Sequence, residues 1–382
     1  MGEKKPIRVI INTRPFLFKK TGIGYYTYNL FNGLKQSGEV EVYPTIDKSS
    51  TTVLRFMSGI SQSVRKVLGD SVLKISVPFG DLLIGKRERA NSIPDADIYH
   101  EPNYDVIPPG RWRSVATIHD LAFLKYPEYL PEAVLLKCRA NISNILNADR
   151  FIVTTGAVRG ELVDAYGFPE RRIDVIPLAP SGNYYPVNRE QKEGIKNIRR
   201  YSGGRDYILY VGTIEPRKNI KTLLKAFRVV RDRLKVMLIL AGGKGWKYDD
   251  IIKMPQKLGI QKDVVFTGYV DEKTILYLYN YASVVVYPSI YEGFGLPVIE
   301  AMSCGVPVII SDIPSLREVA GNAAVSFNYD DYEELAGKIE QIITSTGLSE
   351  ELRIKGLQRS KEYSWDKTVS STIHSYKRVL EE

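Results

Sequence analysis

The chain has 382 residues, of which 44% are hydrophobic and 25% charged, a balance typical of a soluble globular protein with room for two cores. The 53 basic and 44 acidic side chains leave a net charge of +9, which favours an anionic partner: a nucleotide, a nucleic acid or a membrane surface. The apolar runs are too short to span a bilayer, and the N-terminus lacks the long apolar stretch of a signal peptide, so we expect a cytoplasmic protein.

Short apolar runs rich in β-branched residues alternate with helix-like segments along the chain, and each run predicts a buried strand. In the first half the predicted strands are residues 7–12, 40–46, 96–100, 115–119, 150–155 and 173–179. In the second half they are residues 207–213, 236–242, 263–269, 282–289, 307–312 and 323–327. Continuous apolar strands separated by helices indicate parallel sheets covered on both faces. We therefore predict an α/β protein with two doubly wound, Rossmann-like domains.

A polar stretch at residues 181–205 separates the two sets of strands. We therefore predict an N-terminal domain over residues 1–182 and a second domain over residues 183–360. The segment 361–382 should form a helix that packs back towards the N-terminal domain. Its apolar side chains recur at helical spacing and are Val369, Ile373, Tyr376 and Leu380.

Ligands of doubly wound sheets bind beyond the carboxyl ends of the strands, so the residues after each strand are the candidates for function. The stretch YPSIYEGFGLPVIEAMSCGVPVIIS, residues 287–311, places a glycine loop between a strand and a helix. Pro297 suits the first turn of that helix, where its missing N–H costs nothing, and Gly305 suits the C-terminal cap. Gly293 and Gly295 let a ligand approach the backbone, and the unpaired N–H groups of a helix start attract phosphate.

Two acids flank this loop, because Glu292 precedes it and Glu300 lies one turn into the helix. A carboxylate contacts phosphate unfavourably but accepts hydrogen bonds from hydroxyl groups. A ligand with hydroxyls on both sides of a diphosphate is a nucleotide sugar, so we predict that Glu292 holds the sugar and Glu300 the ribose. A solvated loop acid beside a surface helix acid is the alternative, and the agreement of strand, glycines, proline and spacing speaks against it.

From these motifs the chain resembles the retaining glycosyltransferases of family 4, which have the GT-B fold of two Rossmann-like domains facing across a cleft. The matching stretches are VVFTGYVDEKTILYLYNYASVVVYPSIYEGFGLPVIEAMSCGVPVIISD, YVGTIEPRKNIKTLLKAF and TIHDLAFLKYPE. The resemblance is specific from about residue 205 to residue 325 and weaker in the first half. The sequence EPRKN looks most like that of bacterial mannosyltransferases that build polysaccharides or lipid-linked glycans.

The resemblance implies roles for residues at several strand ends. It assigns Lys218 to the donor's diphosphate, where a cation stabilises the charge that builds as the sugar departs, with Arg217 as a helper. Many family members carry Arg where this chain has Thr213, so either Arg217 substitutes or phosphate neutralisation rests on Lys218. His119 is implied to hydrogen-bond the donor sugar, and Asp120 either fixes its tautomer or caps the following turn.

Further donor contacts are implied at three loops. Tyr269 and Val270 follow a predicted strand, and their backbone would hold the base. Gly22 and Gly24, in TGIGYYTYNL, would turn backbone amides towards the diphosphate and the acceptor, although many first strand-to-helix turns contain such glycines. The donor-binding loop of the second domain comprises Glu292, Gly293, Phe294, Gly295 and Leu296.

No metal site and no cofactor are expected. Only two cysteines occur, Cys138 and Cys304, and their apolar surroundings indicate buried free thiols; so few partners make a zinc site improbable. No Asp-x-Asp-like pair follows a strand. We therefore expect Lys218 and helix N-termini to do the work of a metal ion.

Residues 53–74 carry an apolar helical face with basic residues elsewhere around it. This pattern fits an interfacial helix at the inner face of an anionic membrane, which a lipid-linked acceptor would require. It fits a core helix packed on the first sheet equally well.

Together these features predict a retaining hexosyltransferase. The predicted donor is a nucleoside diphosphate sugar, GDP-mannose favoured, and the predicted acceptor is a glycan or a lipid-linked glycan. Catalytic roles are assigned to Glu292, His119 and Lys218. The alternatives are a GT-B epimerase and a non-catalytic protein that binds sugar nucleotides. A nucleic-acid partner is not expected, because aromatic and basic residues do not interleave in the manner that stacks bases.

Overall fold

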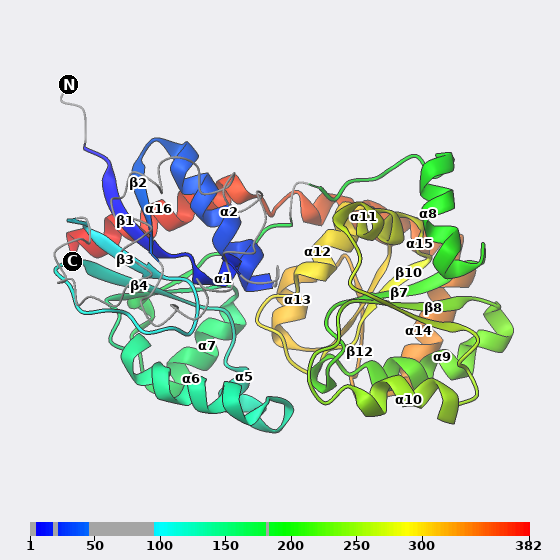
Figure 1. Cartoon of the computed structure of the whole chain (residues 1–382). Helices are drawn as coiled ribbons and strands as arrows, with labels where there is room; N and C mark the ends of the chain where they lie inside the picture. Colours follow the sequence, from blue (N-terminus) through cyan, green and yellow to red (C-terminus); the bar gives the residue numbers. More distant parts are fainter. Residues whose placement is uncertain (1–4, 18–21, 46–94, 181–182) are drawn as a thin grey trace, which may run out of the picture.

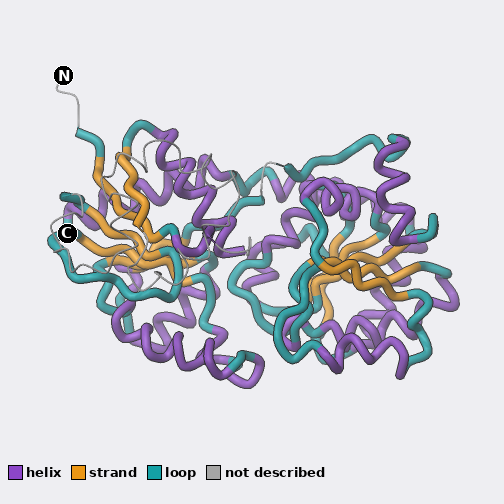
Figure 2. The backbone as a smooth tube through the Cα atoms, in the orientation of Figure 1, coloured by secondary structure: helices purple, strands orange, loops and turns teal. Residues whose placement is uncertain are grey.

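A computed structural model describes residues 5–17, 22–45, 95–180 and 183–382, which form two domains side by side (Figures 1 and 2). Each domain is built around a six-stranded sheet, and its neighbouring strands all run parallel. All the predicted strands are present, which confirms two doubly wound α/β domains. The predicted amphipathic segment at residues 53–74 lies outside the described residues.

The N-terminal sheet has the strand order β2-β1-β3-β4-β5-β6. Its strands are β1 (Ile7–Asn12), β2 (Val40–Thr45), β3 (Ile98–Glu101), β4 (Arg113–Ile118), β5 (Arg150–Val153) and β6 (Ile173–Val175). Every residue of β3 and β5 is buried, as expected for strands covered on both faces. The strand order reverses between β1 and β3. The carboxyl ends of these strands lie on the side of the sheet that faces the second domain (Figure 1).

Helices cover both faces of this sheet (Figure 1). On one face α2 (Gly22–Ser37) packs against β2 and against the last helix of the chain, α16 (Trp365–Glu381). The other face carries α5 (Ala122–Lys125), α6 (Glu132–Ile145) and α7 (Gly156–Tyr166). The remaining described elements are α1 (Arg14–Leu17) and two 3-10 turns, Pro127–Tyr129 and Glu170–Arg172.

Helix α16 packs on α2, β4 and β5, although it follows the second domain in the sequence. Its buried apolar side chains are Val369, Ile373, Tyr376 and Val379. Leu380, which was predicted for this stripe, is 41% exposed; Val379 occupies the core position instead, so that part of the prediction is wrong. The exact domain boundaries at residues 182 and 360 stay predictions.

The second sheet has the strand order β12-β11-β10-β7-β8-β9. Its strands are β7 (Tyr207–Val211), β8 (Met237–Ala241), β9 (Val264–Gly268), β10 (Val284–Tyr287), β11 (Val308–Ser311) and β12 (Val325–Phe327). Numbered within the domain this order is 6-5-4-1-2-3, the arrangement of dinucleotide-binding domains. The order reverses between β7 and β10, so the loops after these two strands meet at the position where such domains bind ligands.

One face of the second sheet is covered by α9 (Ile220–Leu234), α10 (Asp249–Lys257) and α14 (Tyr332–Thr344). The other face carries α8 (Lys192–Ser202), α11 (Glu272–Tyr281) and α12 (Leu296–Ser303), with α15 (Thr346–Ser360) packed on α12. Helix α13 (Pro314–Ala320) contacts α7 of the first domain.

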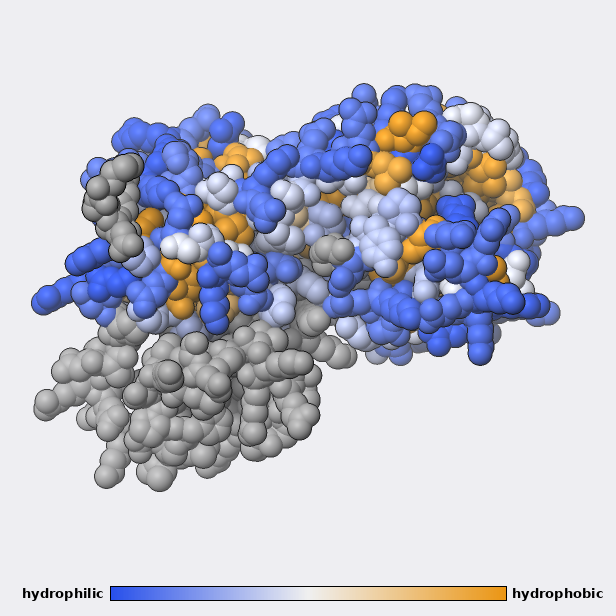
Figure 3. All heavy atoms as spheres, turned by 90° about the horizontal axis from the view of Figure 1, so that it is seen from above, coloured by the Kyte–Doolittle hydropathy of each residue, from blue (hydrophilic) through white to orange (hydrophobic). Residues whose placement is uncertain are grey.

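The surface seen in Figure 3 is mostly hydrophilic over the described residues, and apolar residues appear there only in patches. Of the helices in the described part of the chain, none combines the length and the apolar character that a membrane crossing requires. Both cysteines are free, and Cys304 is buried as predicted, whereas Cys138 is only partly buried.

Candidate active site

Lys218 follows β7 in a single 3-10 turn, Pro216–Lys218, that leads into α9. Pro216 takes the first position of the turn, and Asn219 then adopts a φ of 54°, a left-handed conformation that asparagine tolerates better than most residues. Lys218 is only 9% exposed. A lysine buried to this extent needs an anionic partner.

The carboxylate of Glu292 is this partner. β10 ends at Tyr287, and the following loop places Glu292 beside the strand end, where it is 8% exposed. Lys218 Nζ donates a hydrogen bond to Glu292 Oε1, and the Tyr287 hydroxyl donates to the same oxygen at 3.0 Å. The second carboxylate oxygen, Oε2, lies 3.4 Å from Nη1 of Arg217. Both oxygens of Glu292 are therefore engaged by donors from its own domain.

Two cations determine the charge of Glu292. Burial alone would raise its pKa, but Lys218 and then Arg217 outweigh burial and lower the pKa to about 2. Arg217 also pairs with Glu215, with 3.1 Å between Nη2 and Oε1. Glu215 is 2% exposed, and burial raises its pKa. At neutral pH Glu292 is thus a fixed anion inside a cluster of two cations and two carboxyl groups.

The glycine loop after Glu292 reaches the N-terminal domain. Hydroxyls of Thr154 and Thr155, which follow β5, both donate to the Gly293 carbonyl oxygen at 3.0 Å. A Cβ at position 293 would overlap the carbonyl oxygen of His119, so this close approach requires glycine. The loop predicted to bind the donor and the end of β4 therefore meet at the domain interface.

The rest of the loop leads into α12 as predicted. Gly295 has a φ of 95° and precedes the helix, which begins with Leu296 and Pro297. Phe294 is 5% exposed and stands edge-on to the Tyr363 ring, with centroids 5.7 Å apart. The helix ends before Gly305, whose φ is 69°. At the start of α12 Pro297 has no N–H, and the Val298 N–H donates to the Gly295 carbonyl oxygen at 3.0 Å. This end of the helix carries the positive side of the helix dipole.

His119 directly follows β4 and is 9% exposed. Its Nε2 lies 2.9 Å from the carbonyl oxygen of Pro102, which can only accept, so the neutral ring carries its proton on Nε2 and Nδ1 is an acceptor. Burial lowers the pKa of His119, which keeps the ring neutral at neutral pH. Asp120 accepts from the Ala122 N–H at 2.9 Å, so it caps the next turn, and the tautomer is fixed by Pro102 instead.

Glu300 lies in the second turn of α12, in different surroundings. The Tyr279 hydroxyl on α11 donates to Glu300 Oε2 at 2.9 Å. Burial raises the pKa of Glu300 to about 7, although the hydrogen bond from Tyr279 opposes the rise. Glu300 forms no ion pair with any described residue, and it stays partly exposed.

Three residues predicted at strand ends of the second domain lie apart from this cluster. Thr213, Tyr269 and Val270 make no hydrogen bond or ion pair with Lys218 or Glu292 among the described residues. Thr213 is exposed, and Tyr269 is 62% exposed after β9, two strands away from β7. Their roles in donor binding stay predictions.

The predicted glycine pair of the first domain lies in the first turn of α2. Gly22 is exposed with open space around its Cα, and Gly24 is buried. On the same turn the Tyr25 hydroxyl donates to Glu272 Oε1 at 2.9 Å, so the start of α2 contacts the start of α11 in the other domain. A role of these glycines at the diphosphate stays a prediction.

Sequence reasoning missed several residues of the site. Tyr287 is the last residue of β10, and Thr154 and Thr155 follow β5. The expectation that functional residues lie at the carboxyl ends of strands could have identified all three. Tyr279 lies inside α11 among other aromatic residues, and its pattern does not differ from that of a core tyrosine.

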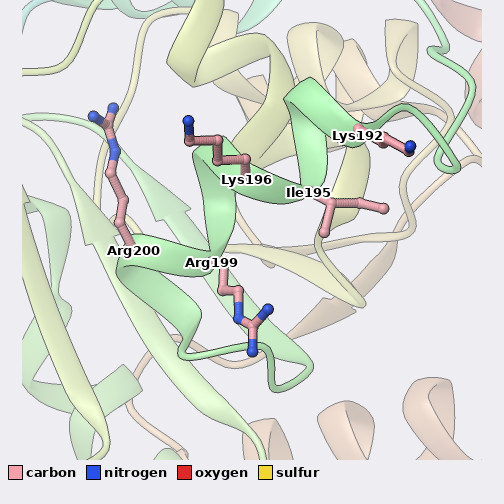
Figure 4. A pocket seen from close by; sticks show the side chains of 5 residues that line it. All are labelled: Lys192, Ile195, Lys196, Arg199 and Arg200. Carbon is pink, nitrogen blue, oxygen red and sulfur yellow. The ribbon is translucent and has the colours of Figure 1, made fainter.

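Helix α8 carries a basic surface that sequence reasoning also missed. Four exposed cations share one side of the helix with Ile195, which is 42% exposed (Figure 4). They are Lys192, Lys196, Arg199 and Arg200. None of these cations forms an ion pair with a described residue. Arg200 donates to the Thr274 hydroxyl at 3.2 Å and lies over the Tyr201 ring.

Known protein family models match most of each domain. The model described as Glycosyltransferase Family 4 matches residues 20–179, and the model described as Glycosyl transferases group 1 matches residues 191–359. The O-antigen chain mannosyltransferase B of Escherichia coli is 32% identical over 97% of this chain and 100% of its own length. A D-inositol 3-phosphate glycosyltransferase of Rhodococcus erythropolis is 28% identical over 62% of this chain and 55% of its own length.

Solved structures share the two-domain architecture. The sucrose-phosphate synthase of Thermosynechococcus elongatus has a TM-score of 0.72 at 19% identity, over 99% of this chain and 100% of its own. Anabaena HepE, solved in complex with UDP, has a TM-score of 0.69 at 17% identity, over 98% and 100%. WaaG, a glycosyltransferase involved in lipopolysaccharide biosynthesis, has a TM-score of 0.65 at 13% identity, over 96% and 98%. At these identities the likeness bears on the fold alone, and it confirms the predicted GT-B fold.

Proposed function

Because the chain belongs to glycosyltransferase family 4, we propose that it transfers mannose from GDP-mannose to a glycan or lipid-linked acceptor, with retention of configuration. The chain is a glycosyltransferase, and we propose the sugar, the base, the acceptor and the stereochemistry. Mannose is supported by the Escherichia coli O-antigen mannosyltransferase, which is similar over nearly the whole chain. An acceptor on a growing glycan is supported by the same relative.

One observation carries the proposal: a buried lysine and a buried glutamate meet at the switch point between β7 and β10. Rossmann-like domains bind nucleotides at this position. The donor's diphosphate would lie over Lys218 and the start of α12. Lys218 and the positive end of the α12 dipole would then stabilise the negative charge that develops on the leaving diphosphate.

In the proposed reaction, the bond between the sugar's C1 and the diphosphate oxygen breaks, and the electron pair leaves with the diphosphate. The acceptor hydroxyl oxygen bonds to C1 from the same face, and its proton passes to an oxygen of the leaving phosphate. The ionised Glu292 would lie close to the sugar as it gains positive character, and His119 Nδ1 would accept a hydrogen bond from a sugar hydroxyl. Lys218, Arg217 and the helix dipole would supply the positive charge, so no metal ion is needed.

A panel of nucleotide sugars tests the donor. Purified protein is incubated with GDP-mannose, GDP-glucose, UDP-glucose and UDP-N-acetylglucosamine, and slow hydrolysis and thermal shift are followed. Fastest hydrolysis of GDP-mannose, with the α configuration retained in the released sugar, is the expected result. Preference for a UDP sugar would overturn the proposed donor, and inversion would overturn the stereochemistry. Conversion of the donor sugar into its epimer, without hydrolysis or transfer, would favour the epimerase alternative.

We extend this proposal to a peripheral contact with an anionic membrane, because a lipid-linked acceptor lies at a bilayer. Residues 53–74, which first suggested the contact, lie outside the described residues. Within the described residues the unpaired cations of α8 support it, since basic clusters bind anionic lipid headgroups (Figure 4).

Sedimentation with vesicles tests this contact. Wild-type protein is expected to sediment with phosphatidylglycerol vesicles and to stay in solution with phosphatidylcholine vesicles. A variant with alanine at the four α8 cations should bind anionic vesicles more weakly. Equal recovery of wild type with both lipids removes the membrane contact, and unchanged binding of the variant removes α8 from it.

A further inference from the structure

The side chain that holds Glu300 in place comes from a neighbouring helix. Tyr279, in the last turn of α11, is completely buried, and its hydroxyl donates to Glu300 Oε2 at 2.9 Å. The other carboxylate oxygen, Oε1, makes no hydrogen bond with any described residue. Because Glu300 is partly exposed, Oε1 is available to a ligand. One oxygen is therefore fixed by the protein, and the other is left for an external donor.

A second tyrosine supports the first. Tyr184, from the segment that links the domains, stands edge-on to the Tyr279 ring with centroids 5.5 Å apart. This contact and the core around α11 restrict the Tyr279 ring, so its hydroxyl has one position relative to the carboxylate. The interdomain segment thereby contributes to the geometry of a binding residue in the second domain.

Among the residues that the structure describes, the titratable groups that interact with Glu300 are uncharged at neutral pH. They are Tyr279 on α11, Tyr184 on the linker, Tyr25 on α2 and Cys304 at the end of α12. Burial raises the pKa of each of them above its ordinary value, so none of them titrates between pH 5 and pH 8. Glu300 is thus the group of this cluster that exchanges a proton in that range, and no described cation holds it in the ionised form.

We propose that Tyr279 is a positioning residue that orients the Glu300 carboxylate for the ribose hydroxyls, and that proton uptake by this carboxylate weakens nucleotide binding. The inference rests on the proposed function, in which Glu300 accepts hydrogen bonds from the ribose. An ionised carboxylate accepts from two neighbouring hydroxyls, whereas a protonated carboxyl has lost part of that capacity. The nucleotide therefore binds the ionised form better, and affinity depends on the fraction ionised.

The sign of the pH dependence follows from linkage. Burial raises the pKa of Glu300 to about 7, so below that pH the free protein carries the proton and must release it to bind. Affinity is expected to be constant above about pH 7.5. Below pH 7 it should fall, by up to about tenfold per pH unit, because one proton is released on binding. The fall ends where Glu300 becomes protonated in the complex as well.

Calorimetry with GDP between pH 5.5 and pH 8.5 tests the inference, with UDP as a second probe. Only the part of the pH dependence that Glu300→Gln abolishes is assigned to Glu300, since GDP itself takes up a proton near pH 6. Tyr279→Phe keeps the ring and removes the hydroxyl, so the carboxyl pKa should rise and the midpoint should move to higher pH. At pH 7 this variant should bind GDP roughly tenfold more weakly, the scale of one hydrogen bond to a charged group.

Tyr207→Phe is the matched control. Tyr207 is also buried in the second domain, and its hydroxyl donates at 2.7 Å to the carbonyl oxygen of Leu278, the residue before Tyr279, and not to Glu300. Its loss should leave the midpoint unchanged. A midpoint that stays in place in Tyr279→Phe, or moves equally in Tyr207→Phe, overturns the positioning role.

The outcomes separate this inference from the function on which it rests. If the affinity for GDP depends on pH in the same way in wild type and in Glu300→Gln, the inference is overturned and nucleotide binding is left intact. Binding of neither GDP nor UDP at any pH overturns the proposed function and the inference with it.

Discussion

Glu292 lies in a loop and Glu300 in the helix that follows it, and both accept a hydrogen bond from a tyrosine hydroxyl. Their surroundings differ in whether a cation lies beside the carboxyl group. Glu292 contacts Lys218 and Arg217. These cations outweigh the effect of burial and lower its pKa to about 2. Glu300 contacts Tyr279, and burial raises its pKa to about 7. The first acid is a permanent anion and the second can take up a proton near neutral pH. Two identical side chains thus acquire different chemistry from their neighbours alone.

The topology of the sheet explains the difference. Because β7 and β10 are neighbours, the basic turn after β7 lies beside the loop after β10, and its cations reach Glu292. Glu300 has already turned into α12, where the adjacent helix α11 offers aromatic side chains. A permanent anion suits a sugar that gains positive charge, and an uncharged tyrosine shell suits the neutral hydroxyls of a ribose.

Removing Lys218, the cation that donates to Glu292, is expected to have the largest effect. Lys218→Ala should lower turnover roughly a hundredfold or more, the scale of losing one preorganised donor to developing charge. Lys221→Ala is the matched control, because Lys221 lies one turn further along, is half exposed and pairs with Asp250 on the surface. Steady-state kinetics with the full donor measures both. Turnover of Lys218→Ala close to that of the control would contradict the assignment of Lys218.

Neutralising Glu292 should lower the free energy of unfolding more than neutralising Glu300. Glu292→Gln removes the carboxylate that pairs with Lys218 and one of the two that pair with Arg217, and should lower the free energy of unfolding at pH 7 by on the order of 3 kcal/mol. Glu300→Gln replaces a carboxyl that has no cationic partner, so its loss should be much smaller. Urea denaturation of the free proteins measures both changes. Equal losses would show that the two environments do not differ as described.

The same variants should respond to pH in opposite directions. The depressed pKa of Glu292 contributes stability above the ordinary glutamate range, and that contribution is lost as pH falls from about 4.5 towards 2. The raised pKa of Glu300 works the other way, because the native state binds the proton more tightly, so its effect destabilises the protein as pH rises from about 4.5 to 7. The free energy of unfolding of Glu300→Gln, measured relative to that of wild type, should therefore increase as the pH rises from 5 to 8. Denaturation at both pH values checks this, and a gain towards acid pH would contradict it.

Chelation should have the smallest effect. If Lys218, Arg217 and the start of α12 neutralise the leaving diphosphate, turnover with the full donor should be unchanged in EDTA. Protein dialysed against EDTA and assayed with and without added magnesium or manganese provides the measurement. Loss of turnover that either metal restores would refute the metal-free mechanism.

Much of the fold was predictable, because local patterns specify it. Apolar β-branched runs identified each strand, and Pro297 and Gly305 marked the ends of α12. Leu380 was misplaced on α16, since Val379 and Leu380 are adjacent apolar residues and only packing decides which faces the core. Most strand boundaries lie within two residues of the predicted ones, and β6 ends at Val175, four residues before its predicted end. The apolar run continues there past the last ladder hydrogen bond.

The candidate site was predictable as a set of strand-end residues, but its internal contacts were not. The sequence suggested that Lys218 and Glu292 face different parts of one ligand, whereas the structure joins them in a direct ion pair. This pair depends on the strand order β10-β7, which the sequence does not display. Tyr279 was missed because a tyrosine that supports an acid and a tyrosine that fills a core have the same helical spacing.

The division of labour between the two acids is tested most directly by calorimetry with GDP at pH 8, where both carboxyl groups of the wild type are mainly ionised. Glu300→Gln should weaken GDP about tenfold, because the ribose is part of that ligand. Glu292→Gln should bind GDP at least as tightly as wild type, since GDP carries no transferable sugar and Lys218 is no longer shared with a carboxylate. Its defect should appear instead in turnover with the full donor. Equal loss of GDP affinity in the two variants would contradict this account.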